Sequence, residues 1–542
     1  MDNKLDWQEK MKRDITEAEG KTFDLIIVGG GIIGANIARD ASMRGLKTLI
    51  LEKDDFATGT TSRSTRLIHG GFRYLQHFEF GLVRDDMRER EILLKIAPHL
   101  VHPLPFLIPL TKPTDRFIMS AGTLLYDILS YDKSVPGRKH YSKKTTMKME
   151  PNMKLEGLRG ADQYFDCQIW FTERLCLENI VSAVENKAVA LNHAKVTGIL
   201  KEGNTVNGVK VQDTLTGKEY EIKSRMVVNA AGHWMDAVCG MMYGQPKRMV
   251  RRTKGVHLLT PRLSNNALVL YAKSDGRLWF VIPAGKYSLV GTTDTDYKGD
   301  LEAVYSDKQD VDYLMKEVQR VFPNLDTSDI YYTFAGLRSL PDSGDEKPSN
   351  VSRAHKTIDH EKLDGVKGFI SVLGGKITGA RGISEEITDL VCKKMDIKVK
   401  CKTATTPLPG APMVTREELS KYTADTKIDF ETVSYLASLY GSRYTKVLDY
   451  AQRGARGIQP LCQHSKDITA EIWYAVGEES TYTVSDFMMR RSGLGLAECQ
   501  GLDAVEIVGR EMGKLFNWSP EEQQRQVNEY RNTASLAQKY KE

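Results

Sequence analysis

The pattern of apolar and polar residues near the start of the chain predicts a strand, a glycine turn, a helix and a second strand. Residues 25–28 are apolar, a glycine cluster follows at 29–31, and a second apolar run at 48–51 ends in Glu52. The segment between the two apolar runs is helix-like. Strand, turn, helix and strand in this order form a parallel unit of the dinucleotide-binding type.

The pattern in the middle of the chain predicts a second lobe that is built on an antiparallel sheet. Short apolar runs alternate with turn residues from 249 to 296, which is typical of strands joined by tight connections. Residues 111–165 are irregular and rich in Lys and Pro. We expect a discontinuous substrate-binding lobe that comprises approximately residues 111–172 and 246–334.

The remaining segments divide into a tail, a linker and a helical region. Residues 1–22 are polar and charged, and they lack the apolar core of a secretory signal. A Pro/Gly-rich linker at 401–412 interrupts the pattern, and residues 413–542 are mostly helical. We therefore expect a cofactor-binding domain at 23–400, into which the antiparallel lobe is inserted, and a helical C-terminal domain.

Composition narrows the class of protein. The chain has 542 residues, of which 41% are hydrophobic and 27% charged, as in a globular protein with two or more folding units. The net charge of +5 mildly favours anionic ligands or a membrane surface and is too weak to indicate nucleic acid. The seven cysteines show neither a CxxC pair nor metal-ligand spacing, so we expect reduced thiols and no metal site. We expect no segment that spans a bilayer, because no apolar run reaches about 18 residues.

Three glycines match the dinucleotide fingerprint GxGxxG between the first strand and the helix. Gly29 allows the tight turn, Gly31 lets the backbone approach a pyrophosphate, and Gly34 permits close packing of the helix on the strand. The start of the helix then presents amide donors to the phosphates. Glu52 is placed to accept hydrogen bonds from a ribose hydroxyl. The fingerprint indicates a dinucleotide without separating FAD from NAD, and the alternative is a glycine turn that binds nothing.

The stretch TTSRSTRLIHGGFRYL, residues 60–75, favours a flavin. Small hydroxyl residues crowd it, and a flavin needs close approach of the backbone at its pyrophosphate and ring edge. The strand in MVVNAAGHWMD also ends in small residues, as if a cofactor lies against it. The cofactor-binding residues expected from these segments and from the turn at 374–378 are Ser62, Ser64, Thr65, His69, Gly71, Ala231, Gly232, Gly375 and Thr378.

The same stretch has basic residues at helical spacing, at 63, 66, 69 and 73. Gly70 and Gly71 stand in its middle, where each would weaken a helix by roughly 1 kcal/mol. We therefore expect the chain to turn here, so that the segment connects cofactor and substrate and does not form one basic helix.

Six stretches carry a resemblance to a known family. They are residues 28–75, GVHLL at 255–259, VGTTDTDYKGD at 290–300, GLRSL at 336–340, GGKIT at 374–378 and 471–496. Together they resemble the FAD-dependent glycerol-3-phosphate dehydrogenases of the aerobic, quinone-linked kind, among the glycine-oxidase-like flavoproteins. The resemblance implies an α/β plus α fold: an FAD-binding Rossmann-like domain of the glutathione-reductase or glycine-oxidase type, an inserted antiparallel-sheet substrate domain and a helical C-terminal domain.

The resemblance also implies a reaction, in which sn-glycerol 3-phosphate is oxidised to dihydroxyacetone phosphate. A hydride would pass from C2 to FAD, and the electrons would go on to a membrane quinone. His257 is a candidate base, because an unperturbed imidazole titrates near pH ~6.5. Arg338 could stabilise the oxygen as its proton leaves. The alternatives are a structural histidine in a strand and an arginine in a surface salt bridge.

The substrate phosphate needs fixed cationic donors, for which arginine is well suited. Arg73, Tyr74 and Lys376 resemble the residues that hold the phosphate in the family, although Lys376 also fits a solvated turn. Thr293 and Asp294 are expected at the substrate cavity, and both residue types are equally routine in turns.

Several alternatives and partners stay open at this stage. A glycerol-3-phosphate oxidase would use oxygen and release hydrogen peroxide, a related amine or amino-acid oxidase would share the fold, and a non-enzymatic scaffold would hold FAD only as structure. The expected partners are glycerol 3-phosphate, a quinone and a membrane surface, with a homodimer left open. Residues 117–144 pair an apolar half with a basic cluster, so they fit either an amphipathic helix on anionic lipid or a solvated loop. The expected location is cytoplasmic, peripheral on the inner face of the cytoplasmic membrane.

Overall fold

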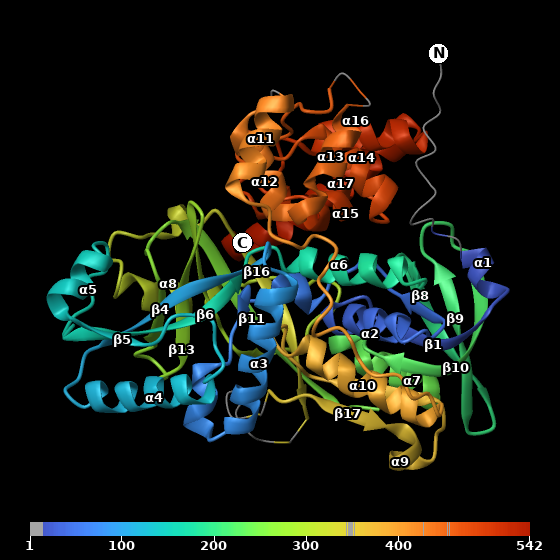
Figure 1. The fold of residues 1–542 in the computed structure, drawn as a ribbon, viewed down its shortest axis with the longest axis horizontal. Coiled ribbons are helices and arrows are strands. Elements are labelled where there is room, and N and C mark those ends of the chain that lie inside the picture. Colours follow the sequence, from blue (N-terminus) through green and yellow to red (C-terminus); the bar gives the residue numbers. More distant parts are fainter. Residues whose placement is uncertain are drawn as a thin grey trace.

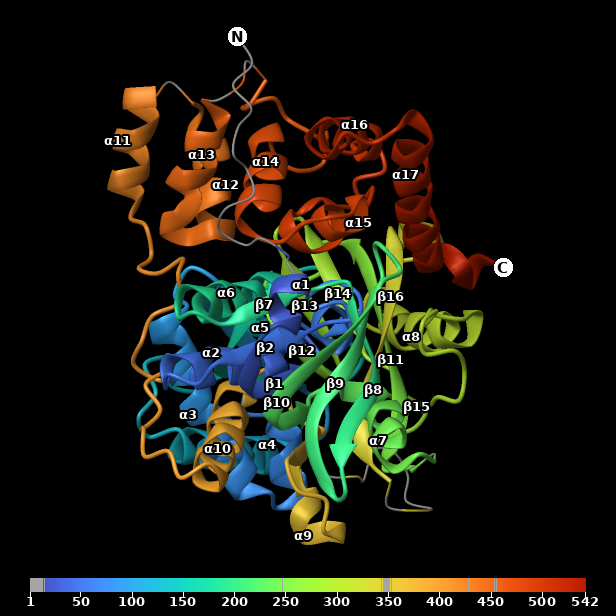
Figure 2. The ribbon, with the colours of Figure 1, turned by 90° about the vertical axis from the view of Figure 1, so that its right-hand side faces the viewer.

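The computed structural model describes residues 13, 15–245, 247–342, 344, 351, 353–426, 428–452, 454 and 456–542, without the side chains of residues 73, 76 and 77. Two β-sheets lie side by side, and a layer of helices from the end of the chain lies over them (Figures 1 and 2). Part of the tail predicted at 1–22 falls outside the described residues. Within it, α1 (Ile15–Glu19) is helical.

The first sheet has the strand order β17-β18-β10-β1-β2-β7, and the hairpin β8–β9 extends from β10. From β18 to β7 all neighbouring strands are parallel, while β17 and β9 pair antiparallel with β18 and β10. The strands are β1 (Thr22–Val28), β2 (Thr48–Leu51), β7 (Val189–Leu191), β8 (Ala194–Glu202), β9 (Thr205–Asp213), β10 (Glu219–Asn229), β17 (Lys356–Asp359) and β18 (Phe369–Leu373). This sheet contains the parallel unit that the glycine fingerprint predicted.

Both faces of the first sheet are covered. Leu25 and Ile27 belong to one hydrophobic core with helices α2 (Ile32–Met43), α6 (Thr172–Glu185) and α10 (Ala380–Lys394). The alternate residues Ile26 and Val28 belong to a second core with α7 (Met235–Tyr243) and the β8–β9 hairpin. A strand that is buried on both faces is apolar at every position, which explains the unbroken apolar run at 25–28.

The second sheet has the strand order β15-β11-β14-β13-β12-β4-β6-β3, with β16 beside β11 and β5 beside β6. The pair β12–β4 is parallel, and the other pairs described in this sheet are antiparallel. The strands are β3 (Leu67–Ile68), β4 (Val101–Leu110), β5 (Lys139–Ser142), β6 (Gly160–Ile169), β11 (Val250–Pro261), β12 (Ala267–Tyr271), β13 (Leu278–Ala284), β14 (Tyr287–Gly291), β15 (Thr295–Asp296) and β16 (Tyr332–Pro341).

The second sheet differs from its prediction at one end. Residues 111–165, expected to be irregular, contain helices α4 (Asp115–Leu129) and α5 (Lys143–Met149) and most of β6. Strand β4 precedes the predicted boundary at residue 111 and contains Pro103, Pro105 and Pro109. Proline lacks the N–H that a strand donates to its neighbour. The sequence pattern therefore did not indicate a strand in this proline-rich segment. Helices α3 (Phe80–Ile96), α8 (Lys308–Gln319) and α9 (His360–Asp364) complete this part of the chain.

The C-terminal region is helical, as predicted. Its helices are α11 (Arg416–Thr426), α12 (Phe430–Tyr440), α13 (Tyr444–Ala451), α14 (Thr469–Glu478), α15 (Val484–Asp486), α16 (Val505–Phe516) and α17 (Pro520–Ser535). It is joined to the first sheet by buried ion pairs, among them Arg491 with Asp55 at 2.7 Å. No helix in the described part of the chain is both long and apolar enough to cross a membrane.

Candidate active site

One cavity of about 640 Å³ is lined by residues from both sheets. The first sheet contributes the glycine turn after β1 and Glu52 after β2, and the second contributes His257 of β11 and Arg338 of β16. This volume lies in the range of pockets for small molecules and cofactors. The predicted cofactor-binding and catalytic residues therefore border a single space.

The glycine turn cannot carry side chains at two of its three positions. Gly29 has a φ of +110°, and a Cβ there would lie 2.6 Å from the carbonyl oxygen of Ala230. At Gly34 a Cβ would lie 1.9 Å from the carbonyl oxygen of Gly29, so this glycine lets α2 pack on the turn. Gly31 directly precedes α2 and leaves the start of the helix open toward the cavity. The open helix start fits the diphosphate of a dinucleotide such as FAD.

Glu52 faces this turn with its carboxylate already held by two backbone donors. The amide of Gly30 donates to Oε2 at 2.7 Å, and the amide of Asp54 donates to Oε1 at 3.0 Å. Burial raises the pKa of Glu52 to about 7. A half-buried carboxyl group with room for further hydrogen bonds fits the predicted contact with a ribose hydroxyl.

The hydroxyl-rich segment after β2 has more than one role. Ser64 lines the cavity as predicted, but Ser62 is not among the lining residues, and its hydroxyl donates to the carbonyl oxygen of Thr58 at 3.2 Å. Ser62 therefore has a role in its own turn, and its predicted contact with the cofactor stays a prediction. Thr61, which the sequence reasoning missed, lines the cavity and accepts a hydrogen bond from the amide of Ile32 at 3.0 Å. The sequence signal for Thr61 was its position in the same hydroxyl-rich run.

The remaining predicted cofactor residues all line the cavity; they are Thr65, His69, Gly71, Ala231, Gly232, Gly375 and Thr378. Thr378 joins two of these segments, because its hydroxyl accepts a hydrogen bond from the amide of His69 at 3.0 Å. Burial and the charge of Lys376 lower the pKa of His69 to about 3. His69 is therefore a neutral ring at physiological pH.

His257 projects from β11 on the face opposite the core. Its neighbours Val256 and Leu258 are buried in the core that β11 shares with α8, whereas His257 lines the cavity and stacks on Phe334 with ring centroids 5.0 Å apart. Its Nε2 lies 3.0 Å from the hydroxyl of Thr65. Thr65 therefore positions the candidate base, a role beyond the cofactor contact predicted for it.

The pKa of His257 differs from that of an unperturbed imidazole, which is about 6.5. Burial and the charge of Arg338 lower its pKa to about 3. Its Nδ1 is buried and has no hydrogen-bond partner among the described residues. The ring is therefore neutral at physiological pH, which is the form that accepts a proton.

Arg338 lies against the same strand as His257. A Cβ at Gly255 would lie 2.3 Å from Arg338 Nη2, so the glycine leaves the space that the guanidinium occupies. Gly255 and His257 are two residues apart on one strand and therefore share a face. Local geometry thus brings the two predicted catalytic residues together.

Asp294 holds two arginines in place. Its carboxylate contacts Arg338 at 3.1 Å and Arg353 at 2.7 Å. Burial alone would raise the pKa of Asp294, but the two arginines outweigh it and lower the pKa to about 2. Asp294 also lines the cavity, so its predicted place at the substrate stays a prediction beside this counter-ion role.

Thr293 lines the cavity at which the sequence predicted it, and it also has a structural role. Its hydroxyl accepts a hydrogen bond from the amide of Val256 at 3.0 Å and is 2% exposed. This bond ties the end of β14 to β11.

Two of the three predicted phosphate-binding residues meet at the cavity. Lys376 Nζ lies 4.2 Å from the centre of the Tyr74 ring and pairs with Asp86 of α3. Burial raises the pKa of Asp86 to about 7, although Lys376 opposes this shift. Gly71 has a φ of +79°, and a Cβ there would lie 2.2 Å from the Tyr74 ring. The side chain of Arg73 lies outside the described residues.

The basic residues at helical spacing do not share one helix. Residues 60–63 and 72–77 form two short 3₁₀ helices, η1 (Thr60–Arg63) and η2 (Phe72–His77), that are separated by β3 and the glycines. Arg66 pairs with Glu173 through both terminal nitrogens, at 2.9 and 2.8 Å. The predicted turn within this segment is confirmed, and Arg66 is a buried structural cation.

Two further arginines lie at the site, and no sequence motif indicated either of them. Arg277 lines the cavity and donates from Nη2 to the carbonyl oxygen of Asp294 at 3.0 Å. Arg353 lines it as well and contacts the Asp294 carboxylate. Neither residue belongs to a motif that the sequence reasoning used. Together with Arg338 they make this part of the cavity strongly cationic.

Comparisons with known proteins agree with this geometry. Residues 24–390 match the family described as "FAD dependent oxidoreductase", and residues 401–523 match "C-terminal domain of alpha-glycerophosphate oxidase". The chain is 38% identical to a glycerol-3-phosphate dehydrogenase of Synechocystis over 96% of this chain and 97% of that protein. It is 34% identical to an aerobic glycerol-3-phosphate dehydrogenase of Staphylococcus haemolyticus, over 98% and 96% of the two chains.

A solved structure shares the whole architecture. The glycerol-3-phosphate dehydrogenase of Bacillus halodurans complexed with FAD superposes with a TM-score of 0.78 at 30% identity, and 96% of each chain is covered. The fold class predicted from the sequence is thereby confirmed.

Proposed function

The chain belongs to the FAD-dependent glycerol-3-phosphate dehydrogenases within the FAD-dependent oxidoreductase family, and from this premise we propose that it oxidises sn-glycerol 3-phosphate to dihydroxyacetone phosphate and passes the electrons to a quinone. The observation that carries the proposal is one cavity bordered by a dinucleotide turn, His257, Arg338 and the Lys376–Tyr74 pair. FAD, when bound, supplies the acceptor for the two electrons and the hydrogen removed from C2. Gly29, Gly31 and Glu52 are the residues that would hold its adenosine diphosphate half.

His257 takes the proton of the C2 hydroxyl. Its neutral ring accepts a proton, and the hydroxyl becomes more acidic as C2 is oxidised. Protonation of this buried ring costs free energy in the transition state. The negative charges of the substrate oxygen and of the phosphate offset that cost. Arg338 stabilises the negative charge on that oxygen, and Thr65 holds the ring in register.

Lys376 and Tyr74 hold the phosphate, together with Arg73. In the structure Lys376 is paired with Asp86, whose pKa is raised to about 7 by burial. A dianionic phosphate provides a stronger partner for this lysine, and Asp86 takes up a proton readily near neutral pH. Arrival of the substrate therefore exchanges one ion pair for another within the cavity.

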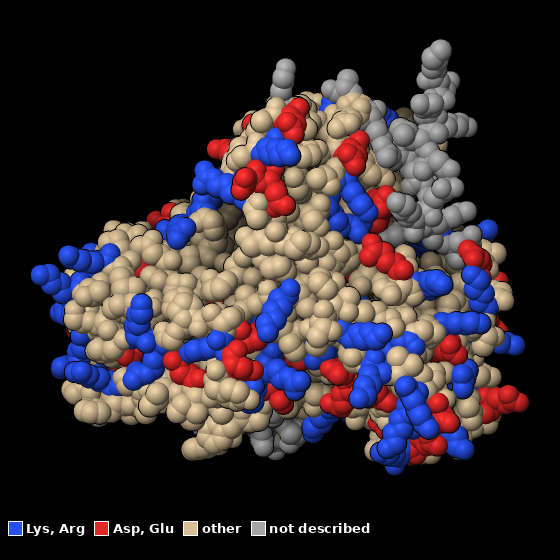
Figure 3. All heavy atoms as spheres, in the orientation of Figure 1, with Lys and Arg blue, Asp and Glu red and all other residues tan. Residues whose placement is uncertain are grey.

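The acceptor is dissolved in lipid, so the enzyme rests on the inner face of the cytoplasmic membrane through α4. Phe117 and Ile128 are 79% and 59% exposed on this helix. In Figure 3, Lys and Arg side chains gather where Figure 1 places α5. The edge below them, where Figure 1 places α4, is largely uncharged. An apolar face flanked by cations suits an anionic lipid surface.

Anaerobic reduction of the bound flavin tests the proposed substrate. The purified yellow protein should lose its visible absorbance on addition of glycerol 3-phosphate and keep it with glycine or proline. Bleaching by an amino acid in place of glycerol 3-phosphate would assign the chain to the amino-acid oxidases, and no bleaching by either would leave only a structural role for FAD.

The electron acceptor needs a separate measurement, because an oxidase would give the same bleaching. Turnover should be sustained by a soluble quinone analogue in the absence of oxygen. In air without quinone, hydrogen peroxide should form much more slowly than the product forms with quinone. Peroxide formation at the full rate of turnover would identify a glycerol-3-phosphate oxidase.

A further inference from the structure

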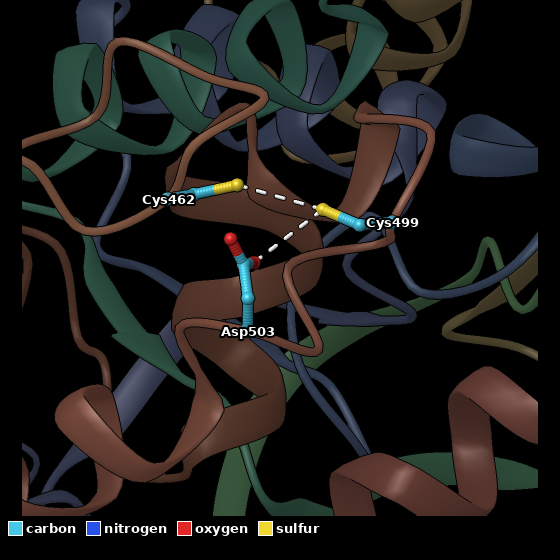
Figure 4. Close-up of side chains that lie close together, drawn as sticks. All are labelled: Cys462, Cys499 and Asp503. Carbon is cyan, nitrogen blue, oxygen red and sulfur yellow. Dashed lines mark hydrogen bonds between the residues drawn. The ribbon is translucent and has the colours of Figure 1, made fainter.

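Two cysteines from different loops meet in the helical domain beside an aspartate (Figure 4). Cys462 lies between α13 and α14, and Cys499 and Asp503 lie before α16. The sulfurs of the cysteines are 3.5 Å apart, and the sulfur of Cys499 is 3.4 Å from Asp503 Oδ1. One ligand atom from each of the three residues lies within 4.8 Å of the other two. The three side chains thus point into one small volume.

The spacing of these atoms is that of ligands around a zinc ion. With Zn–S bonds of about 2.3 Å and Zn–O bonds of about 2.0 Å, two sulfurs of a tetrahedral site stand about 3.8 Å apart, and a sulfur and an oxygen about 3.5 Å. The observed separations of 3.5 and 3.4 Å are within a few tenths of an ångström of these values. Both cysteines are free thiols, and a disulfide would need the sulfurs at about 2.05 Å.

Backbone donors already surround the ligand atoms. The amide of His464 donates to the sulfur of Cys462 at 3.2 Å, and the amide of Gly501 donates to that of Cys499 at 3.3 Å. Each donor comes from the second residue after its cysteine. The amide of Gln463 donates to the other oxygen of Asp503 at 3.0 Å. Such donors stabilise anionic ligands and orient them.

We propose that Cys462, Cys499 and Asp503 bind a divalent cation of borderline softness, Zn²⁺ in the first place, with water as a further ligand. Thiolates select such ions over Mg²⁺ and Ca²⁺. Cys462 is buried, whereas Asp503 is exposed, so the site has an entry path from solvent. The sequence predicted no metal because the cysteines stand 37 residues apart, outside any short motif.

The proposed metal would be structural, since it joins two loops at the contact with the second sheet. Glu498, next to Cys499, pairs with Lys286 at 3.1 Å, and its amide donates to the hydroxyl of Tyr287 at 3.1 Å. Both partners stand at β14. A metal on Cys499 would hold this turn against the sheet and so stabilise the docking of the helical domain.

Metal analysis of the purified holoenzyme tests the site. After dialysis, about one zinc ion per chain is expected in the parent and in Cys401→Ser, a thiol control of similar exposure, and less than about one tenth in Cys499→Ser. With Co²⁺ as the probe, the parent should show ligand-field bands at longer wavelengths than the flavin absorbs. Removal of the metal should lower the melting temperature of the parent and leave that of Cys499→Ser unchanged.

Asp503→Asn keeps the test decisive if a cysteine variant does not fold. The variant should bind Co²⁺ at least about tenfold more weakly than the parent and keep a normal flavin content. Even a residue that only hydrogen-bonds to a metal ligand contributes about tenfold to metal affinity. Absence of zinc and of Co²⁺ bands in the reduced parent would overturn the proposal. A Cys462–Cys499 disulfide found by peptide mass spectrometry, with no metal uptake after reduction, would overturn it equally.

Discussion

At the scale of single residues, three glycines shape the active site by leaving room for larger side chains. A Cβ at Gly255 would meet the Arg338 guanidinium at 2.3 Å, and one at Gly71 would meet the Tyr74 ring at 2.2 Å. A Cβ at Gly291 would lie 2.5 Å from the His257 ring. The space left at each of these glycines therefore determines where one functional group lies. The positions of catalytic groups are set as much by these gaps as by hydrogen bonds.

We expect Gly255→Ala to lower kcat/KM for glycerol 3-phosphate by about 100-fold, because a displacement of about 1 Å at a reacting group has that cost. Flavin content and melting temperature should change little, since the clash involves the far end of a flexible side chain. In Gly81→Ala the added methyl group meets nothing within 4 Å, so this variant serves as the control. Undiminished turnover in Gly255→Ala would contradict a role for Arg338 at the substrate.

His257→Gln should lower kcat by about 10²–10⁴-fold if His257 is the base. Thr65→Val removes only the hydrogen bond to the ring, so its loss should be roughly tenfold, the equivalent of one hydrogen bond. Stopped-flow reduction of the flavin measures both effects directly. A rate within a few-fold of the parent for His257→Gln would move the base to another group.

The residues that spacing alone identified are those whose role is local. Gly29, Gly34 and Glu52 act within one strand–turn–helix unit, so their spacing carries their function. Arg277 and Arg353 act on Asp294 across the fold, and nothing in their own neighbourhood distinguishes them from surface arginines. The pairing of Asp294 with arginines needed the structure for the same reason, and it adds a structural role to the one predicted for that aspartate.

At the scale of elements, hydrophobic periodicity identified strands and helices but could not say which sheet face meets the cavity. The apolar run in GVHLL predicts a strand, yet only the pairing of β11 with β14 and β16 shows that His257 faces the site. Strand β4 was missed because of its prolines. Pairings between distant strands depend on contacts that no local pattern records.

The exposed face of α4 is an element whose apolar residues have no partner within the described chain. Phe117→Asp should weaken binding to anionic vesicles by about tenfold or more, since one buried aromatic side chain contributes about 1.5–3 kcal/mol. Turnover with a soluble quinone analogue should remain at the parental level. Vesicle flotation measures the binding, and Ile458→Asp serves as the control because it alters an exposed apolar residue, 52% exposed, in the helical domain. Equal losses in both variants would argue against α4 as the contact.

At the scale of the whole molecule, the helical domain and the first sheet depend on one buried charge cluster. Asp55 contacts Arg490 and Arg491, and the Asp55 side chain is fully buried. Asp55 follows Glu52 closely, so the cluster also supports the loop beside the dinucleotide turn. The docking of the C-terminal domain is thereby coupled to the shape of the cofactor end of the cavity.

Asp55→Asn should destabilise the folded protein by about 3–5 kcal/mol, because it leaves the buried Arg491 without its counter-ion and Arg490 with Asp486 alone. Flavin should be released at a lower temperature than in the parent. Thermal unfolding followed by flavin fluorescence measures both effects. Asp312→Asn, which breaks an exposed pair with Lys308, should change stability by less than about 1 kcal/mol. Similar melting temperatures for the two variants would contradict the role of the Asp55 cluster.

Buried histidines should make the whole molecule sensitive to acid. Burial lowers the pKa of His360 to about 4, against about 6.5 in an unfolded chain. Between these values the unfolded state binds more protons, so stability is lost as the pH falls through this window. His360 accepts or donates hydrogen bonds to Tyr243 and Ser371 at 2.7 and 2.9 Å, away from the cavity. His360→Gln should therefore narrow the difference in melting temperature between pH 7 and pH 5 without altering turnover, and an unchanged difference would mean that the pKa of His360 is the same in the folded and unfolded chains.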